Sequence, residues 1–171
     1  AVLYADWSLA AYQSGEPERA RSLAERALHA AEESTERRDL ARAHNILGIL
    51  ARRSGDLTEA RGQFEQSLSL IEQADDPAAR VAALNNLALV EGSSGNTGRA
   101  LELANDALKL CVTYGDRHRA AALHNNLADL LHASGKPAVA MEHLKQSVRI
   151  YAEIGREADE WQPEIWKLVE W

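Results

Sequence analysis

The sequence has a single cysteine, Cys111, so it can form neither an intramolecular disulfide bond nor a cysteine-based zinc site. One cysteine suits a reducing compartment, and we expect the protein to be cytoplasmic. Positive charge is also scarce, because 19 Lys and Arg residues face 26 Asp and Glu residues and leave a net charge of -7. Such a chain is poorly suited to nucleic-acid phosphates or to an anionic membrane surface, and we expect neither partner.

Long apolar segments are missing as well. No apolar run reaches the roughly 18 residues that a membrane-spanning helix needs. No charged-then-apolar signal segment opens the chain. The sequence lacks an initiator Met and enters a helical pattern at Ala1, which suggests that the 171 residues are a piece of a longer protein.

Residue patterns that carry chemistry are equally scarce. The 6 histidines include no HExxH motif and no pair four residues apart with a carboxylate, so we expect no metal site and no cofactor. The glycine-rich stretch 92–98 follows a helical pattern and lacks the Lys-Ser/Thr ending of a phosphate-binding loop, so we interpret it as a turn. Cys111 lies on the apolar side of a predicted helix, which indicates an unreactive core thiol. Nothing suggests a nucleophile beside a base, and we expect that the protein is not an enzyme.

What the sequence does contain is a repeat of 40 residues. The dipeptide Ser-Gly recurs at this period, an alanine follows five residues after each glycine, and a small residue stands seven residues before each glycine. The glycines are Gly15, Gly55, Gly95 and Gly135, the alanines are Ala20, Ala60, Ala100 and Ala140, and the small residues are Ser8, Gly48, Ala88 and Ala128. Small residues let helices approach closely, and a fixed period of this length indicates a stacked array of four units.

Apolar residues within each unit follow the period of an α-helix, and no stretch alternates with the period of a strand. Asp56 and Asn96 stand where a helix cap is expected, and Pro17 and Pro137 stand at first helical positions. The sequence therefore predicts one helical hairpin per unit. The first helices are expected near 37–53, 77–93 and 117–133, and the second helices near 17–33, 57–73, 97–113 and 137–153.

The repeat pattern resembles the tetratricopeptide repeat. Leu87-Ala88, Gly95, Ala100 and Ala107 show the resemblance in the third unit, and it recurs in all four units. Two departures are a period of 40 instead of 34 and the loss of a large aromatic late in the first helix, where Ala51, Glu91 and Leu131 stand. Longer repeats of this kind are similar to those of kinesin light chains and of bacterial signalling regulators; Leu84-Asn85-Asn86-Leu87-Ala88 is close to the kinesin light chain pattern.

The resemblance implies an all-α fold, a right-handed α-solenoid of four helical hairpins whose first helices line a concave groove. The four repeats would cover residues 1–155, divided at about 1–35, 36–75, 76–115 and 116–155. Residues 156–171 would form a C-terminal capping helix, because Ile165, Leu168 and Val169 make an apolar stripe that would cover the exposed end of the array. The alternative is that Trp166 and Trp171 face outward, as a surface for another domain or for self-association.

Five asparagines stand at two adjacent offsets in the predicted first helices, namely Asn45, Asn85 and Asn125 at one and Asn86 and Asn126 at the next. Asparagine is disfavoured inside helices, so a ladder at 40-residue spacing requires a reason. Either the amides bond neighbouring helices, or they clamp the backbone of a bound peptide. The same helix face adds Arg42, Ile49, Arg52, Arg53, Leu89, Asp129 and His132, with basic residues toward the N-terminal end.

These observations predict a noncatalytic scaffold that holds an extended peptide or partner segment in the groove. The alternative is a sensory or autoinhibitory domain of a larger bacterial signalling or transcriptional regulator, which would bind another domain of its own chain or a small ligand. The sequence does not identify the partner.

Overall fold

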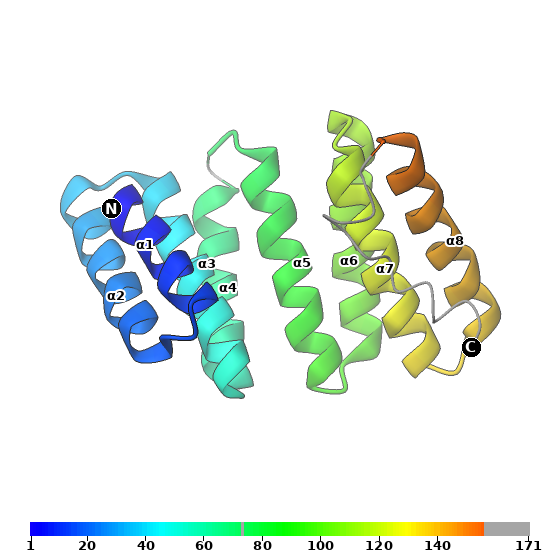
Figure 1. Ribbon diagram of the computed structural model, residues 1–171, viewed down its shortest axis with the longest axis horizontal. Helices are drawn as coiled ribbons and strands as arrows, with labels where there is room; N and C mark the ends of the chain where they lie inside the picture. The colour runs from blue at the N-terminus through cyan, green and yellow to red at the C-terminus, as the bar shows by residue number, and fades with distance from the viewer. Residues whose placement is uncertain (73, 156–171) are drawn as a thin grey trace.

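The computed structural model describes residues 1–72 and 74–155, and within them the chain forms eight α-helices and no strand. The predicted capping helix at 156–171 lies outside the described residues. The helices form four consecutive hairpins, as predicted, and the two helices of each hairpin are its A and B helices (Figure 1). Their bounds are α1 Val2–Gln13, α2 Pro17–Ser34, α3 Arg37–Ser54, α4 Leu57–Ile71, α5 Pro77–Ser93, α6 Thr97–Tyr114, α7 Arg117–Ala133 and α8 Pro137–Glu153.

Most helix ends follow the predicted signals. The carboxylate of Asp56 accepts the backbone N–H of Glu59 at 2.9 Å and so caps α4. Pro17 and Pro137 occupy the first turns of α2 and α8, where their missing N–H has no helical partner to lose. The four Ser-Gly pairs form the A-to-B turns, and their glycines have φ between 75° and 88°, a conformation that glycine adopts without a Cβ clash.

The start of α6 differs from the prediction. Asn96 stands at the N-cap position, but its side chain makes no capping hydrogen bond. Its Nδ2 instead donates at 2.7 Å to Oε2 of Glu91, which is only 7% exposed. A buried carboxylate needs protein donors, whereas an exposed helix end can bond to water. The Asn96 side chain therefore donates to the Glu91 carboxylate and does not cap α6.

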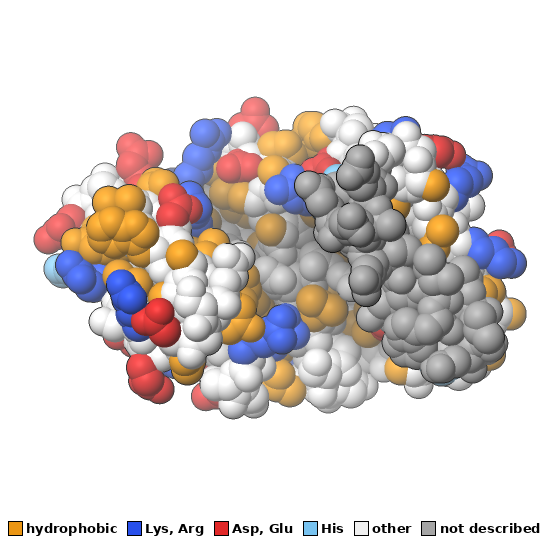
Figure 2. All heavy atoms as spheres, in the orientation of Figure 1, with side chains coloured by type: hydrophobic (Ala, Val, Ile, Leu, Met, Phe, Trp, Pro, Cys, Tyr) orange, Lys and Arg blue, Asp and Glu red, His pale blue; other side chains and the backbone are white. Residues whose placement is uncertain are grey.

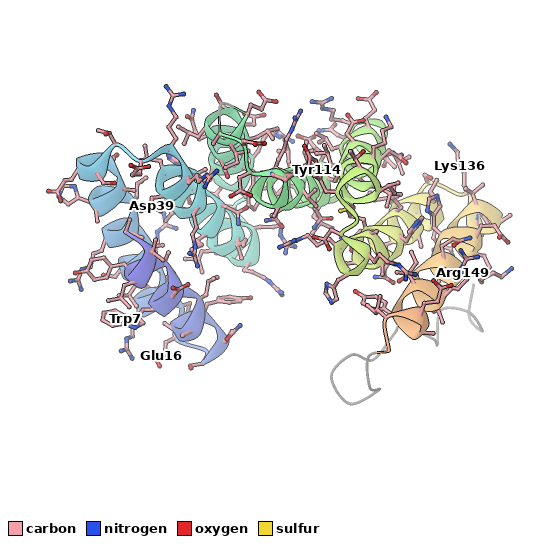
Figure 3. The ribbon with its side chains drawn as sticks, turned by 90° about the horizontal axis from the view of Figure 1, so that it is seen from above. Trp7, Glu16, Asp39, Tyr114, Lys136 and Arg149 are labelled. Carbon is pink, nitrogen blue, oxygen red and sulfur yellow. The ribbon has the colours of Figure 1, made fainter. Side chains whose placement is uncertain are left out.

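The order of packing makes the array curve. Each B helix packs against the A helix of its own repeat, and α2, α4 and α6 also pack against the A helix of the next repeat. The A helices α1, α3, α5 and α7 also contact one another in succession, while the B helices among the described residues do not form such a series. Because the A side is the tighter side, the array bends toward it, and Figure 3 shows the resulting arc with α1 and α8 at its ends.

The distance between the two helices of a hairpin depends on a pair of facing residues. In the second hairpin Gly48 faces the ring of Phe64, and a Cβ at Gly48 would lie 2.6 Å from that ring. In the fourth hairpin the corresponding residues are Ala128 and Leu144, both fully buried. The small residues seven positions before each turn glycine therefore lie where the two helices approach, as the sequence predicted.

The interior divides into three apolar clusters along the array, the largest of which spans the second to fourth repeats. Cys111 belongs to this central cluster and is 1% exposed. Burial raises the pKa of its thiol to about 11, so the thiol stays protonated at neutral pH, as predicted for a core cysteine. None of the described helices is long and apolar enough to cross a membrane.

Candidate functional site

The asparagines form a hydrogen-bonded ladder across the A helices. Nδ2 of Asn86 on α5 donates to Oδ1 of Asn45 on α3 at 2.9 Å, and Nδ2 of Asn126 on α7 donates to Oδ1 of Asn85 on α5 at 2.7 Å. All four side chains are half-buried. Each bond uses one N–H of one amide and one lone pair of the other, so every amide keeps further groups that can bond to a ligand. The ladder thus links neighbouring repeats and still presents amides on the concave side.

The ladder does not extend to α1, because the two positions are occupied differently there. Ala5 stands in place of the acceptor asparagine and Ile46 in place of the donor, and both are buried in one apolar cluster. The polar link between these helices is made one turn away, where Arg42 of α3 forms an ion pair with Asp6 of α1. The polar contact between neighbouring A helices is thus an ion pair between α1 and α3, and a hydrogen bond between asparagine side chains in the later repeats.

Two cavities lie along this face and define the concave groove. One has a volume of about 350 Å³ between the first halves of α3 and α5, and the other has about 160 Å³ between α5 and α7. Ala82 and Arg119 line both, so the two form one hollow track along three A helices. The space-filling view in Figure 2 shows the surface hollowed in the middle of the molecule, on the side of the arc toward which the array bends.

The larger cavity is rich in arginine. Arg38, Arg42 and Arg119 line it together with Asp39 and Asp76. Each arginine already has one partner in the protein: Arg42 pairs with Asp6, Arg119 with Asp116, and Arg38 donates to the backbone carbonyl of Asp75 at 3.1 Å. A guanidinium group has five N–H donors, so these contacts hold the arginines in place without exhausting them. Of the basic residues predicted for the N-terminal part of the groove, Arg42 lines this cavity.

The groove includes only part of the predicted set. Arg42, Asn45, Asn85 and Asn86 line the two cavities. The remaining predicted residues stand elsewhere on the A helices: Asn125 and Asn126 are half-buried, Ile49 and Leu89 are half-buried with Ile49 packed against the central apolar cluster, and Asp129 and His132 are exposed and have partners of their own.

Arg52 and Arg53 lie at the end of α3, near α1. The guanidinium of Arg53 lies 5.8 Å from the centre of the Tyr12 ring, which is a cation–π contact. Arg52 is half-buried. Its pKa is lowered mainly by this burial and to a smaller extent by the neighbouring charge of Arg53. Along α3, these two arginines are well separated from Arg38 and Arg42, which line the larger cavity. They therefore form a second basic position on the same helix.

Arg38 and Arg119 were missed by the sequence reasoning. Arg38 stands seven residues before Asn45, on the same helical stripe, and Arg119 stands seven residues before Asn126. Continuing the asparagine stripe two turns toward the helix starts therefore leads to both arginines, a signal that was available in the sequence. That both arginines line the same cavity depends on the curvature of the array, which the sequence pattern does not reveal.

A pair of histidines lies between α7 and α8, away from the cavities. The Nδ1 atoms of His124 and His143 are 2.9 Å apart, and both rings are half-buried. At the equivalent positions of the second repeat, His44 Nδ1 lies 2.8 Å from Oε1 of Gln63. No group of three or more His, Cys, Asp or Glu side chains suited to a metal ion occurs among the described residues. The pair is a hydrogen-bonded joint within the hairpin, because a neutral imidazole can donate through one nitrogen and accept through the other.

This pair predicts a loss of stability in mild acid. Burial, with a smaller contribution from His143, lowers the pKa of His124 to about 4, and burial also lowers the pKa of His143. In the unfolded chain both would titrate near 6.5, so below that pH the unfolded state binds more protons and stability falls as the pH drops toward 4. Allowing for solvent screening of half-exposed rings, we expect a loss of about 1 kcal/mol, measured by urea unfolding between about pH 7 and about pH 4.5.

The chain offers its own control for this prediction. The double substitution His124→Leu, His143→Leu reproduces the Leu84 and Leu103 pair of the third repeat and should remove this part of the acid sensitivity. If the leucine variant loses as much stability in acid as the parent protein, the pair does not contribute to the pH dependence.

The model of the tetratricopeptide repeat family matches residues 1–73 and 79–153, and no curated protein sequence matches the chain. Among solved structures, BtubC (BKLC) from P. vanneervenii is similar with a TM-score of 0.78 and 21% identity, over 90% of this chain and 64% of that one. A putative kinesin light chain from Podosopora anserina, with nearly identical TPR-like repeats, has a TM-score of 0.76 and 19% identity, over 98% of this chain and 82% of that one.

A third similar structure is a Signal Transduction ATPase with Numerous Domains from Pyrococcus horikoshii, which has a tetratricopeptide repeat sensor. Its TM-score is 0.75 at 15% identity, over 87% of this chain and 23% of that one. The chain thus spans less than two thirds of BtubC and less than a quarter of the ATPase. At these identities the likeness concerns the fold, an α-helical repeat array.

Proposed function

The chain belongs to the tetratricopeptide repeat family, and we propose that it is a noncatalytic scaffold that holds an extended peptide or partner segment in its concave groove. Repeats of this family mediate contacts between proteins. The observation that supports the proposal for this chain is the track of two cavities along α3, α5 and α7, lined by ladder amides and arginines. A cytoplasmic location is part of the proposal, since the lone cysteine suits a reducing compartment.

The spacing of the ladder suits an extended ligand. Packed helices lie about 8 to 10 Å apart, and an extended chain advances about 3.3 Å per residue. Successive ladder amides would therefore meet peptide groups about three residues apart. An amide has both donors and acceptors, so it can bond to a peptide group irrespective of the ligand's side chains. The ladder would hold the ligand backbone.

Specificity would come from the side chains beside the ladder. Arg38, Arg42 and Arg119 in the larger cavity favour an acidic portion of the ligand at that end of the groove. Asp129 on the exposed side of α7 favours a basic residue at the other end. Ile49 and Leu89 offer apolar contact between them. We therefore expect ligands that are acidic toward the α3 end.

The test begins with peptides of about fifteen residues, selected on the intact protein from a random library displayed on phage. The selected peptides are then titrated against the double variant Asn85→Ala, Asn125→Ala. Each lost amide contact should cost about 0.5 to 1.5 kcal/mol of binding, so we expect affinity to fall about ten- to a hundredfold. Alanine is the better helix former, so the helices should persist in circular dichroism.

A second variant separates binding from the ladder itself. Asn85 accepts the bond from Asn126, so Asn85→Ala removes a link between repeats together with any ligand contact. Asn85→Asp keeps an acceptor for Asn126 but cannot donate to a peptide carbonyl, so it should melt near the parent protein and still bind more weakly. If the alanine double variant melts several degrees lower while binding is unchanged, the ladder is structural and the proposal fails.

The alternative function is favoured by the likeness to the Pyrococcus ATPase, whose repeats are a sensor in a much longer chain. Under this alternative the array would be a sensory or autoinhibitory domain of a larger bacterial regulator, and the groove would hold another domain of the same protein. The genomic sequence on either side of the coding region tests it. An adjoining NTPase, cyclase or DNA-binding domain would support this alternative, and a gene that encodes only helical repeats would contradict it.

A further inference from the structure

The smaller cavity of the groove is a recess with apolar walls. It has a volume of about 160 Å³ between α5 and α7. Val81 and Leu123 line it and are only 4% and 2% exposed, and Ala82 and Ala122 add half-buried walls. Pockets for drug-sized ligands measure about 300 to 1,000 Å³, so this recess has room for one side chain of a ligand.

The polar groups beside the recess are already held by the protein. Asn85 and Asn86 each use one amide group in the ladder, and Arg119 forms an ion pair with Asp116. Their remaining donors and acceptors can bond to a peptide backbone. A side chain that enters the recess meets the apolar walls, where a charged group would lose its hydration. A compact, branched aliphatic side chain therefore fits the recess best.

The larger cavity beside it favours an acidic side chain instead. At the position equivalent to Ala82, α3 carries Arg42, which lines the larger cavity. Arg38 lines it as well and donates to the backbone carbonyl of Asp75, so among the described residues no carboxylate is paired with this guanidinium. A carboxylate of the ligand can supply that partner through a charge-assisted hydrogen bond.

We propose that the groove recognises a peptide that carries an acidic residue and, three positions away, a leucine, isoleucine or valine. The acidic side chain lies among the arginines of the larger cavity, and the aliphatic side chain enters the recess beside Ala122. The two cavities lie between successive pairs of A helices, which pack about 8 to 10 Å apart. An extended chain advances about 3.3 Å per residue, which gives the separation of three residues. This inference rests on the proposed function and specifies the ligand side chains.

The probe is a peptide of about fifteen residues, selected on the intact protein from the random phage library, with its residues replaced one at a time by alanine. Calorimetric titration measures the affinity of each peptide. We expect two positions three residues apart, one acidic and one aliphatic, to dominate the affinity. Alanine at the aliphatic position should weaken binding at least tenfold, because each buried methylene contributes about fourfold to an affinity.

A substitution in the wall of the recess assigns the aliphatic position to it. Ala122→Leu fills the recess from within and should weaken binding of the selected peptide at least tenfold. The peptide with alanine at the aliphatic position should bind this variant at least as tightly as the selected peptide does, because the two side chains compete for one space. Ala122→Val makes the same comparison with a smaller side chain if the leucine variant melts much lower than the parent protein.

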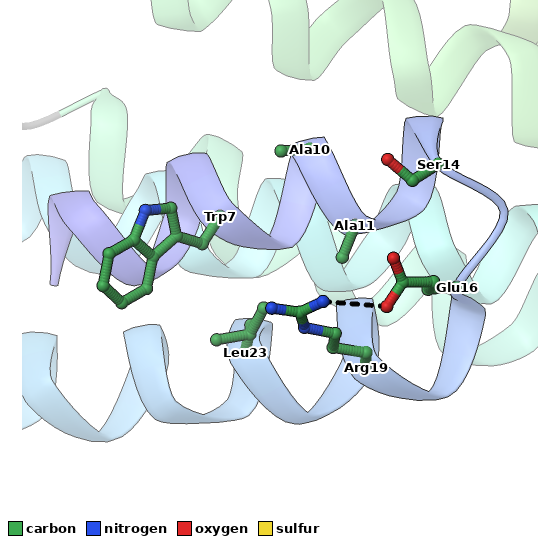
Figure 4. A pocket seen from close by; sticks show the side chains of 7 residues that line it. All are labelled: Trp7, Ala10, Ala11, Ser14, Glu16, Arg19 and Leu23. Atoms are coloured by element: carbon green, nitrogen blue, oxygen red, sulfur yellow. Dashed lines mark hydrogen bonds and ion pairs between the residues drawn. The ribbon is translucent and has the colours of Figure 1, made fainter.

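Ala10 provides the matched control. It lines a cavity of about 270 Å³ formed by α1 and α2, beside Trp7 and outside the groove (Figure 4). Ala10→Leu also adds a leucine to a cavity wall, but it should leave the affinities of both peptides unchanged.

The possible results separate this inference from the proposed function. The inference is overturned if alanine at every aliphatic position of the peptide is tolerated, or if Ala122→Leu discriminates between the two peptides as the parent protein does. In both cases a peptide that is weakened by the double variant Asn85→Ala, Asn125→Ala leaves the proposed function standing. If no selected peptide is weakened by that double variant, the proposed function fails, and this inference fails with it.

Discussion

Replacing Arg61 by leucine is expected to lower the free energy of unfolding by about 3 kcal/mol. Arg61 of α4 donates through Nε and Nη2 to both carboxylate oxygens of Glu91 on α5, at 2.7 and 3.2 Å. The side chain of Glu91 is only 9% exposed, so the substitution leaves a buried carboxylate with Asn96 as its remaining side-chain donor. An uncompensated buried charge is costly, and urea unfolding at neutral pH measures that cost.

The fourth repeat suggests how to restore the stability. Leu101 and Leu131 stand where Arg61 and Glu91 stand one repeat earlier, and Leu101 packs against the cluster that contains Leu131. The double variant Arg61→Leu, Glu91→Leu reproduces this apolar joint and should unfold within about 1 kcal/mol of the parent protein, since well-packed apolar residues can replace a buried ion pair.

Arg21 provides the matched control. It occupies the same offset and pairs with Glu59, but its side chain is 43% exposed and that of Glu59 is 27% exposed. Removing such an exposed partner should cost less than about 1 kcal/mol. Equal losses for Arg21→Leu and Arg61→Leu would show that burial of Glu91 is not the reason for the effect.

The loss in the Arg61→Leu variant should also depend on pH. Burial alone would raise the pKa of Glu91, but the hydrogen bonds from Asn96 and Arg61 outweigh it and hold the pKa below its ordinary value. Glu91 therefore contributes stability above its unfolded pKa, and this contribution is lost as the pH falls through the folded pKa. Protonated Glu91 needs no counterion, so the cost of Arg61→Leu should be smaller near pH 4 than near pH 7.

Replacing Gly48 by alanine is expected to destabilise the second hairpin by about 2 kcal/mol, although alanine is intrinsically the better helix residue. A Cβ at this position would lie 2.6 to 2.9 Å from three atoms of the Phe64 ring, which is fully buried. The two helices must then separate or the ring must leave its rotamer. Thermal and urea unfolding both report the effect.

A control and a rescue distinguish this clash from a general effect of glycine. Gly62 is helical, exposed and has open space around a Cβ, so Gly62→Ala should stabilise the protein by about 0.5 to 1 kcal/mol. The double variant Gly48→Ala, Phe64→Leu reproduces the Ala128 and Leu144 pair of the fourth hairpin and should recover most of the loss. If Gly48→Ala stabilises as Gly62→Ala does, the close approach of α3 and α4 is not maintained in solution.

The sequence alone was sufficient for the helices and for their pairing into hairpins. The helical period, the Ser-Gly turns and caps such as Asp56 are local signals, because they act within one or two turns of the chain. Because each signal recurs in four repeats at the 40-residue period, an ambiguous turn could be interpreted from the three equivalent turns. The same period placed the asparagines on one helix face. Because an amide both donates and accepts hydrogen bonds, the residue type itself suggested the two interpretations of the ladder, bonds between neighbouring helices or contacts with a bound peptide.

The partners of individual polar side chains were decided by the tertiary structure. Arg21 and Arg61 share an offset, yet one pairs with the next B helix and the other with the next A helix, because the acid stands at different offsets in the two repeats. Asn96 serves Glu91 because Glu91 became buried, which no local pattern reveals. In the same way, Arg38 and Arg119 come from different repeats and line one cavity only because the array curves. Periodicity specifies which residues share a helix face, because it acts within a few residues of the chain. Side chains about 40 residues apart meet at distances that depend on the curvature of the array. That curvature results from the sizes of all the residues packed between the helices.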